Sequence, residues 1–498
     1  MSLISSRPTT TTLRALAPYR LPVELPRHAV RWHTQGPADH PLIRHLRAAP
    51  YPRQGPRATL VALGDTWRPE LAGLIAGAVD TARHDGRRVT LVHTGAGGGS
   101  LLRGLAAEHQ VEASCLQLLS TGTAALRSAT TLLASPPTTD DLLIDDTATV
   151  GTTGWRPVPL PPPARLHRDD LVLVTGGLGG LGLAVAAGIA SAGAVPVLVD
   201  RRGPEDLPPH LTRRLGLLRH AAPDTRIIAV DLGCPERTRR LLGGLAPSSV
   251  VHCAGQVAGG TGRTLDTDTV TRLVTAKVDT LHNTVAAIDP RRLTGVIAFG
   301  SVTAYGAHPG LGGYALANEL LRRAMARLAT AGPARHWCTV EWSLWSGAGM
   351  ARQVARTAAR RLGMVPVPVR RGVAATVDLV GALRSPEATS LPGALLVAGV
   401  RAGAQGSWAR RPEGLPGIDA ELVVPPGADL DAAVTAVSEA AAPWLRSPPT
   451  GRPAGRVGLG SEALLVRASV HGDRVECTVA PAADPTAPPI RHYRFSAR

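Results

Sequence analysis

Lysine is almost absent from this chain: of the 54 Lys and Arg residues among 498 positions, only Lys277 is a lysine. This bias is typical of a GC-rich genome, in which arginine replaces lysine wherever any positive charge is sufficient. Lysine differs from arginine in carrying a compact ammonium on a flexible stem, with a pKa that its surroundings can lower. Lys277 is therefore a candidate for a chemical role that arginine cannot fill. The alternative is that it survives by chance.

Aromatic residues make up only 3% of the chain, so its cores must be built from Ala, Leu and Val. The five cysteines, Cys115, Cys234, Cys253, Cys338 and Cys477, form no CxxC pair and no spacing typical of metal ligands. We therefore expect reduced thiols and no metal site. No window reaches about 18 uninterrupted apolar residues, and the N-terminal residues lack an apolar stretch of signal-peptide length. These absences predict a soluble, cytoplasmic protein with no part in a membrane.

The formal net charge of +16 predicts an acidic partner. The arginines are scattered singly or in pairs, without the basic blocks and interleaved aromatic residues typical of nucleic-acid-binding proteins. The sequence thus argues against nucleic acid as the partner and favours an acidic protein. The hydrophobic share of 44% and the charged share of 18% are typical of a folded globular protein, and the length allows two or three domains.

We expect four regions along the chain. Residues 1–20 are polar and predicted to be flexible, and residues 21–165 alternate strand and helix patterns without a complete nucleotide-binding motif. Residues 166–400 repeat that alternation with stronger signals, and residues 401–498 are proline-rich coil around one short hairpin. The clearest boundary is the proline-rich stretch 151–168, which is predicted to be a linker.

The glycine run GAGGGS at 95–100 follows a predicted strand and precedes a predicted helix. Such a loop can bind a phosphate at the helix N-terminus or can serve close packing. No acidic partner for a ribose follows at the expected distance, so we favour packing in this half of the chain.

A second glycine run, TGGLGGLG at Thr175–Gly182, follows an apolar strand and opens a helix. Its glycines fit the dinucleotide-binding pattern, in which they permit a tight turn and let a pyrophosphate approach the helix N-terminus. Asp200 and the pair Arg201–Arg202 stand at the end of the next predicted strand, and Asp231 at the end of the third. Regular alternation of apolar strands and helices predicts an α/β fold with a doubly wound parallel sheet of the Rossmann type.

Four polar residues of the second half can together support carbonyl reduction. Hydride delivery to a ketone places negative charge on its oxygen, which needs a donor in the transition state. Ser301 would hold that oxygen and Tyr314 would donate the proton. A phenol has a pKa near 10, so we expect the ammonium of Lys277 to lower it. Asn318, one helical turn after Tyr314, would connect Lys277 to a water relay.

The residues around this set fall into four blocks: VVHCAG (250–255), FGSV (299–302), YALANELL (314–321) and EWSLWSGAGMA (341–351). With Lys277, Tyr314 and Asn318 they resemble the ketoreductase of modular and iterative polyketide synthases, in the complex branch of the short-chain dehydrogenase/reductase superfamily. The resemblance extends from about residue 28 to about residue 400. The FGS and EWSLWSGAGM motifs are most similar to those of iterative synthases of the enediyne and polyunsaturated-fatty-acid kind. It implies a degenerate Rossmann-like structural subdomain without cofactor, followed by a catalytic Rossmann subdomain.

The resemblance also implies NADPH as the hydride donor, with an arginine on its 2′-phosphate. Asp200 departs from the family, which often has Ser before that arginine, and an acidic residue there favours the free ribose of NADH. Arg201 and Arg202 favour the phosphate, so the prediction is NADPH, with NADH left open. The residues expected at the cofactor are Thr175, Gly176, Gly177, Leu178, Gly179, Gly180, Leu181, Gly182, Asp200, Arg201, Arg202, Asp231, Leu232, Ala254, Gly255 and Lys277.

Two family markers of product stereochemistry are missing, one from QVAGG after HCAG and one from AYGAHPG before Tyr314, so the product configuration stays open. In the tail, PWLRSPPTGRPAG (443–455) resembles the opening of a dehydratase hot-dog domain, but Pro448 stands about where that family places its catalytic His. We therefore interpret residues 401–498 as a dehydratase-like remnant.

The leading hypothesis is a discrete, trans-acting ketoreductase, because no carrier-protein, ketosynthase or acyltransferase motif accompanies the reductase residues. It would reduce a β-keto group of a polyketide intermediate delivered by an acyl carrier protein, and would act as a monomer or weak dimer. A tailoring reductase acting on a mature secondary-metabolite ketone would use the same residues. A catalytically silent scaffold of a synthase is the third hypothesis, and the complete Lys-Ser-Tyr-Asn set argues against it.

Overall fold

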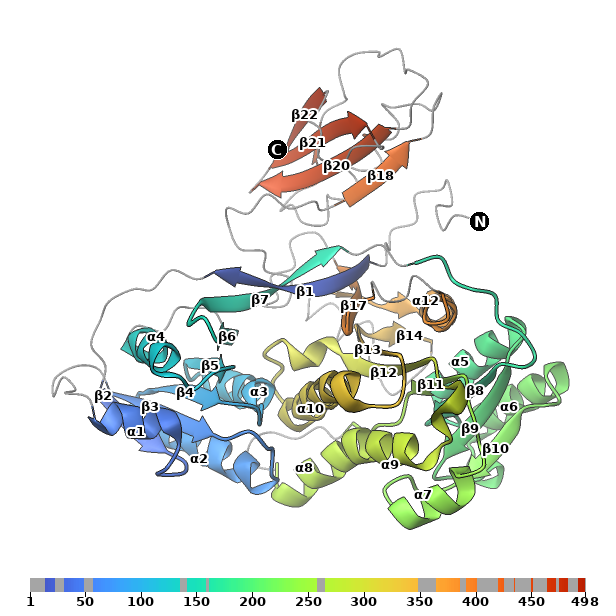
Figure 1. The fold of residues 1–498 in the computed structure, drawn as a ribbon, viewed down its shortest axis with the longest axis horizontal. Helices are drawn as coiled ribbons and strands as arrows, with labels where there is room; N and C mark the ends of the chain where they lie inside the picture. The colour runs from blue at the N-terminus through green and yellow to red at the C-terminus, as the bar shows by residue number, and fades with distance from the viewer. Residues whose placement is uncertain are drawn as a thin grey trace.

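A computed structural model describes residues 14–22, 31–48, 57–134, 141–157, 161–257, 265–347, 364–385 and 391–400, and nearer the C-terminus 420–424, 434, 449–450, 464–471, 474–481 and 491–497. Two α/β halves lie side by side in it (Figure 1), the N-terminal one coloured blue to cyan and the second green to orange.

The first half is a run of parallel strands with helices between them. Its elements are β2 (Arg31–Gln35), α1 (Pro41–Ala48), β3 (Arg57–Leu63), α2 (Glu70–Asp85), β4 (Arg88–His93), α3 (Gly99–His109), β5 (Ala113–Leu118), α4 (Thr123–Ala134) and β6 (Asp141–Ile144). These strands pair in sequence order, each parallel to the one before. Their order therefore never reverses, and a reversal is the feature that opens a nucleotide cleft in such sheets.

The second half is wound in both directions from its first strand. Its elements are β8 (Leu171–Thr175), α5 (Gly180–Ser191), β9 (Val195–Asp200), η1 (Pro204–Asp206), α6 (Pro209–Ala221), β10 (Arg226–Ala229), α7 (Pro235–Leu242), β11 (Ser249–His252), α8 (Thr267–Val274), η2 (Thr275–Asp279), α9 (Thr280–Ala287), η3 (Pro290–Arg292), β12 (Gly295–Ser301), η4 (Val302–Ala304), α10 (Gly312–Ala331), β13 (His336–Trp342), β14 (Trp345–Ser346), β15 (Met364–Val365), β16 (Val367–Pro368), α12 (Val369–Ala382) and β17 (Ala394–Val400). The spatial order β10-β9-β8-β11-β12-β13-β17 is parallel throughout. The order reverses between β8 and β11, so the predicted doubly wound Rossmann-type sheet is confirmed and has its switch point there.

Strands from opposite ends of this region join the two halves into one sheet. β1 (Arg14–Pro22) pairs antiparallel with β17 on one side and with β7 (Val150–Pro157) on the other. β7 in turn pairs antiparallel with β6. Among the described residues the result is a single sheet of fifteen strands.

Two stretches expected to be irregular are therefore strands. Residues 14–20, predicted to be flexible, belong to β1, and residues 151–157, predicted to be linker, belong to β7. Residues 1–20 were predicted to be flexible because they are polar, and 151–168 to be a linker because of its prolines, which cannot donate to a ladder. β17 pairs with β1 only over Arg14–Leu16, so Pro18 follows the end of that ladder and lies opposite Trp155 of β7. The domain boundaries themselves stay predictions.

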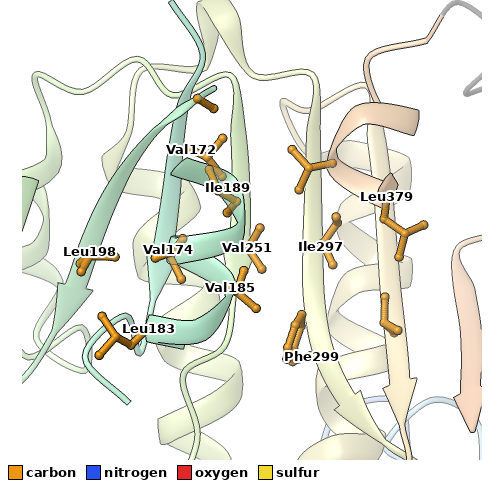
Figure 2. Close-up of a cluster of buried hydrophobic side chains, with 14 of the residues drawn as sticks. Val172, Val174, Leu183, Val185, Ile189, Leu198, Val251, Ile297, Phe299 and Leu379 are labelled. Atoms are coloured by element: carbon orange, nitrogen blue, oxygen red, sulfur yellow. The ribbon is translucent and has the colours of Figure 1, made fainter. Parts of the chain in front are cut away.

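Strands of the second half are apolar on both faces because helices cover both sides of the sheet. Figure 2 shows one of the two buried clusters, in which Val172 and Val174 of β8 pack with Val185 and Ile189 of α5, all four fully buried. Leu173, between the two valines, points to the opposite cluster. This two-sided burial explains the uninterrupted apolar run of β8.

Near the C-terminus, strands of a separate antiparallel sheet pair in the order β18-β20-β21-β22-β19. They are β18 (Ala420–Val424), β19 (Pro449–Thr450), β20 (Leu464–His471), β21 (Arg474–Pro481) and β22 (Arg491–Ala497). The predicted hairpin is confirmed, with His471 of β20 opposite Arg474 of β21. Pro448 lies outside the described residues, and the dehydratase-like origin of the tail stays a prediction.

Candidate functional site

The predicted site residues follow the carboxyl ends of neighbouring parallel strands. Thr175 ends β8, Asp200 ends β9 and Ser301 ends β12, while Ala254 follows β11. Because these strands are parallel and adjacent, their ends meet at one edge of the sheet, on both sides of the switch point. Residues 258–264 and 348–363, which include parts of QVAGG and of the EWSLWSGAGMA block, lie outside the described residues.

The glycine loop between β8 and α5 is packed so tightly that it admits no side chain at its critical points. Gly176 has φ +63°, and a Cβ there would lie 3.0 Å from the backbone of Ala254. A Cβ on Gly182 would lie 2.2 Å from the carbonyl oxygen of Gly176. The bare backbone and the start of α5 at Gly180 thus form a cradle that fits the pyrophosphate of a dinucleotide.

Asp200 lies beside this loop and is 7% exposed. Its Oδ2 accepts a hydrogen bond from the Leu178 amide at 3.2 Å, and its Oδ1 accepts from the backbone amide and Nε of Arg202, both at 3.2 Å. Arg202 therefore offsets the charge of Asp200, while Arg201 is exposed at the same strand end. Asp231 is exposed as well, and its Oδ1 accepts from the Gly233 amide at 2.9 Å.

Lys277 is 4% exposed and lies in η2, a widened π-helical turn between α8 and α9. Such turns are frequent at functional sites. Its Nζ donates to the carbonyl oxygen of Phe299 at 2.8 Å, and its stem lies against Gly255, where a Cβ would be 3.0 Å from Cε. Burial lowers the pKa of Lys277 to about 8, although the carboxyl group of Glu341 opposes this shift.

Ser301, Tyr314 and Asn318 come together beyond β12. Ser301 directly precedes η4, and its Oγ accepts from the Thr303 amide at 3.3 Å. Tyr314 lies in the first turn of α10 and is half-buried, and the fully buried Asn318 donates from Nδ2 to the Tyr314 carbonyl oxygen at 2.8 Å. The Asn318 Oδ1 has no partner.

The sequence predicted that Lys277 lowers the pKa of the Tyr314 phenol, whereas in the structure that pKa is raised. Burial raises the pKa of Tyr314, and hydrogen bonds with the side chains of Asn318 and Ser301 offset it only in part. The physical reason is that the Lys277 ammonium is directed to the Phe299 carbonyl oxygen. Lowering of the phenol pKa would require that ammonium to turn toward the phenol.

Sequence reasoning missed His252, which connects the two sides of the site. The Lys277 carbonyl oxygen can only accept, so His252 Nε2 donates to it, at 2.9 Å. His252 Nδ1 then accepts from Thr175 Oγ1 at 2.8 Å, and that oxygen accepts from the Ala254 amide at 3.3 Å. Burial lowers the pKa of His252 to about 3, so the ring is neutral, as this chain of hydrogen bonds requires. In the sequence, the position of His252 within the VVHCAG block could have indicated that it belongs to the site.

Glu341 of β13 was also missed. It is 0% exposed, its carboxylate lies against Gly300, and burial raises its pKa to about 7. Arg322 of α10 is its ion-pair partner, with 3.8 Å between Nε and Oε1. An acidic residue inside an apolar strand was the signal that could have found it.

A cavity of about 650 Å³ opens in the first half, at the carboxyl ends of its strands, and includes Asp39, His40, Asp65 and Thr94 in its lining. No Arg or Lys lines it, so it does not suit nucleotide phosphates. Across the part of the chain that the structure describes, no group of three His, Cys, Asp or Glu could hold a metal ion. No described helix is long and apolar enough to cross a membrane.

A doubly wound parallel sheet with a closely packed glycine loop at its switch point is typical of the class of dinucleotide-binding α/β proteins. Comparison with known proteins narrows this class. The family model described as "KR domain" matches residues 171–347.

Among curated proteins, erythronolide synthase EryA2 of Saccharopolyspora erythraea is 32% identical over 222 residues, which are 43% of this chain and 6% of that protein. Polyketide synthase GfsA of Streptomyces halstedii is 32% identical over 218 residues, 42% of this chain and 3% of that protein. The chain thus spans only a small part of the length of these relatives.

Solved structures give the same fold over a longer stretch. The ketoreductase from the first module of phoslactomycin biosynthesis in a Streptomyces species has a TM-score of 0.64 at 22% identity, covering 78% of this chain and 94% of that one. A structure of A-type ketoreductases from a modular polyketide synthase has a TM-score of 0.63 at 21% identity, covering 80% and 96%. Residues 171–347 are therefore similar to the KR domain, and most of the chain has the fold of these ketoreductase structures. The finer likeness to iterative synthases stays a prediction.

Proposed function

We propose that this chain is a discrete, trans-acting ketoreductase that uses NADPH to reduce a β-keto group of a polyketide intermediate on an acyl carrier protein. The observation that carries the proposal is the grouping of Ser301, Tyr314 and Asn318 beyond β12, beside the buried Lys277 and the glycine loop. The similarity of residues 171–347 to KR domains of polyketide synthases supports the substrate class.

When bound, the nicotinamide cofactor supplies the hydride. The glycine loop from Gly176 to Gly182 would hold its pyrophosphate, because bare backbone and the start of α5 face that position. Ser301 Oγ would bind the ketone oxygen, and the Tyr314 phenol would give its proton to that oxygen as negative charge develops. Lys277, whose pKa is about 8, is a cation at neutral pH, and its charge would stabilise the phenolate left behind.

Proton return needs a path from the phenolate. The Asn318 Oδ1 is buried and has no partner in the structure, so it is a suitable acceptor for a water molecule in a relay toward Lys277. The proposed role of Asn318 in the water relay thus rests on its position and on its unused Oδ1 acceptor.

NADPH is the proposed cofactor because Arg202 offsets Asp200 and Arg201 is exposed at the same strand end. A guanidinium can bind a 2′-phosphate with two parallel hydrogen bonds. Asp200 uses its oxygens on Leu178 and Arg202, so its charge is partly neutralised before a phosphate approaches.

Charge supports an acidic carrier protein as the partner. The net charge is +16, and the outer helices α6 and α7 expose Arg213, Arg214, Arg219, Arg237, Arg239 and Arg240. Opposite charges speed the encounter of two proteins in a salt-dependent way.

The test is Tyr314→Phe. With trans-1-decalone or an acetoacetyl carrier surrogate as substrate, we expect kcat to fall by about three orders of magnitude or more, because a transition-state interaction is lost. The NADPH dissociation constant, measured by cofactor fluorescence, should stay within about twofold of the wild-type value. A variant that keeps more than about a tenth of the rate would contradict the role of Tyr314.

Tyr305→Phe is the matched control. Tyr305 is also buried, and Arg322 lies 4.5 Å from the centre of its ring, a contact that phenylalanine retains. The same chemical change at this position should leave kcat near the wild-type value.

A further inference from the structure

The glycine loop of the first half, GAGGGS at 95–100, holds a side chain of the second half. Glu319 of α10 reaches across to the start of α3. Its Oε1 accepts from the Gly98 amide at 3.1 Å, and its Oε2 accepts from the Ser100 amide at 2.9 Å and from Ser100 Oγ at 2.6 Å. A carboxylate therefore lies where a helix N-terminus would otherwise bind a phosphate.

The charge of this carboxylate is matched from its own helix. Arg323, one turn further along α10, donates from Nε to Glu319 Oε1 at 3.2 Å. Glu319 is 3% exposed, and burial alone would raise its pKa, but Arg323 and the Ser100 hydrogen bonds hold that pKa well below its ordinary value. Gly97, with φ +82°, leaves room for the contact, because a Cβ there would lie 2.7 Å from Oε1.

α3 also holds the beginning of α10. Glu108 Oε1 accepts from the Gly310 amide at 2.7 Å, and a Cβ on Gly104 would lie 3.0 Å from the Gly312 Cα, so the two helices touch backbone to backbone. Figure 1 shows α3 and α10 side by side at the centre of the molecule. The segment 310–319 is thus attached to α3 at both of its ends.

We propose that Glu319 is a positioning residue for the reduction. It occupies the anion cradle of the first half and thereby fixes the register of α10, which carries Tyr314 and Asn318. This inference rests on the proposed function, because it assigns Tyr314 the proton and Asn318 the relay. A displacement of about 1 Å in a reacting group can lower a rate by about 100-fold.

The test is Glu319→Ala, which removes the carboxylate and leaves its three donors on Gly98 and Ser100. We expect kcat, normalised to the number of NADPH-binding sites, to fall between about 10-fold and 100-fold. The NADPH dissociation constant should stay within about twofold of the wild-type value, since the cofactor loop lies in the other half. Added formate should restore part of the rate, because its carboxylate can enter the emptied cradle.

Glu112→Ala is the matched control. Glu112 belongs to the first half, as the cradle does. Its side chain is 80% exposed and pairs with Arg88 at the surface. This variant removes one carboxylate without touching α10, so kcat should not change and formate should have no effect. Glu319→Gln, which keeps the shape of the side chain, is the second variant if Glu319→Ala does not fold. It should show a smaller loss of kcat, because its amide group can accept from only part of the cradle.

Thermal unfolding separates this inference from the proposed function. Formate should raise the melting temperature of Glu319→Ala and leave those of the wild type and Glu112→Ala unchanged, since a ligand stabilises only a protein that binds it. If the wild type reduces no ketone, the proposed function fails, while formate-dependent stabilisation still decides whether the cradle binds a carboxylate. A normalised kcat equal to that of the wild type in Glu319→Ala or Glu319→Gln would overturn the positioning role. A loss of kcat in Glu319→Ala would also overturn it if formate restored neither the kcat nor the melting temperature.

Discussion

Replacing Lys277 with methionine should stabilise the protein while it abolishes reduction. Burial lowers the pKa of Lys277 from 10.5 to about 8. A base whose pKa is lower in the folded state than in the unfolded state destabilises the fold while it is protonated, and stability rises with pH wherever the unfolded chain binds more protons. The cost is full below pH 8 and disappears as pH rises toward 10.5.

The difference between these two pKa values corresponds to about 3 kcal/mol. Methionine has a similar length and no charge, so it relieves this cost. It also removes the hydrogen bond from Nζ to the Phe299 carbonyl oxygen, which is worth about 1 kcal/mol. At pH 7 we therefore expect Lys277→Met to increase the free energy of unfolding by about 2 kcal/mol.

Urea unfolding between pH 6 and pH 10.5, followed by tryptophan fluorescence, measures this difference. Trp342 and Trp345 report on the relevant core, since both pack against Phe299, at ring distances of 5.3 Å and 6.0 Å. The gain should shrink above pH 8 and change sign near pH 10, where the remaining cost equals the hydrogen bond that is lost. Lys277→Arg is the control, because it keeps the charge over this range and should gain no stability, although it too should lose activity. A methionine variant that is less stable than the wild type at pH 7, or a gain that does not vary with pH, would refute the reasoning.

Three further predictions concern cofactor choice, Glu341 and the carrier protein. Asp200→Ser should raise the preference for NADPH over NADH by about tenfold, measured as the ratio of kcat/KM values, because it removes a negative charge beside the 2′-phosphate; a wild type that prefers NADH would make Asp200 the ribose ligand instead. Burial raises the pKa of Glu341 from 4.5 to about 7, so its cost to the fold is present above pH 7 and lost as pH falls toward 4.5. Glu341→Gln should therefore raise the free energy of unfolding at pH 8 by up to about 3 kcal/mol, with little effect at pH 4.5; an equal effect at both pH values would count against a buried, titrating carboxyl group. A carrier-bound β-ketoacyl substrate should be reduced more efficiently than the matching small thioester at low salt, with the advantage shrinking as ionic strength rises; equal efficiency would favour a tailoring reductase, and no turnover of any ketone would favour a scaffold.

Local patterns were sufficient to predict the α/β fold and the glycine loop. The apolar run of β8 and the glycines that follow lie within a few residues of one another, so their meaning depends little on the rest of the chain. β1 and β7 could not be predicted in this way. Their prolines argue against strands, and only the pairing with β17, which begins far along the chain at Ala394, shows why Pro18 is tolerated.

The missed polar residues depend on long-range contacts in the same way. His252 acts through the backbone of Lys277, and Glu319 finds its partners more than 200 positions earlier, at Gly98 and Ser100. No periodicity or spacing encodes such contacts. The sequence also could not show that the Lys277 ammonium donates to the carbonyl oxygen of Phe299, because a main-chain acceptor leaves no mark in the sequence.

The place of β1 in the sheet has a consequence for the order in which the chain folds. Arg14 pairs with Ala398, so during synthesis β1 waits for one of its two partners until almost four hundred further residues have been added. Contacts of such high sequence separation form slowly and leave edges exposed meanwhile. β1 can pair early with β7, and β17 can then close the sheet last, between two halves that already have their own cores. A ribosome-bound chain that ends before β17 would thus present two open sheet edges, at β1 and at β13, and those edges are where a chaperone or an aggregating neighbour would bind.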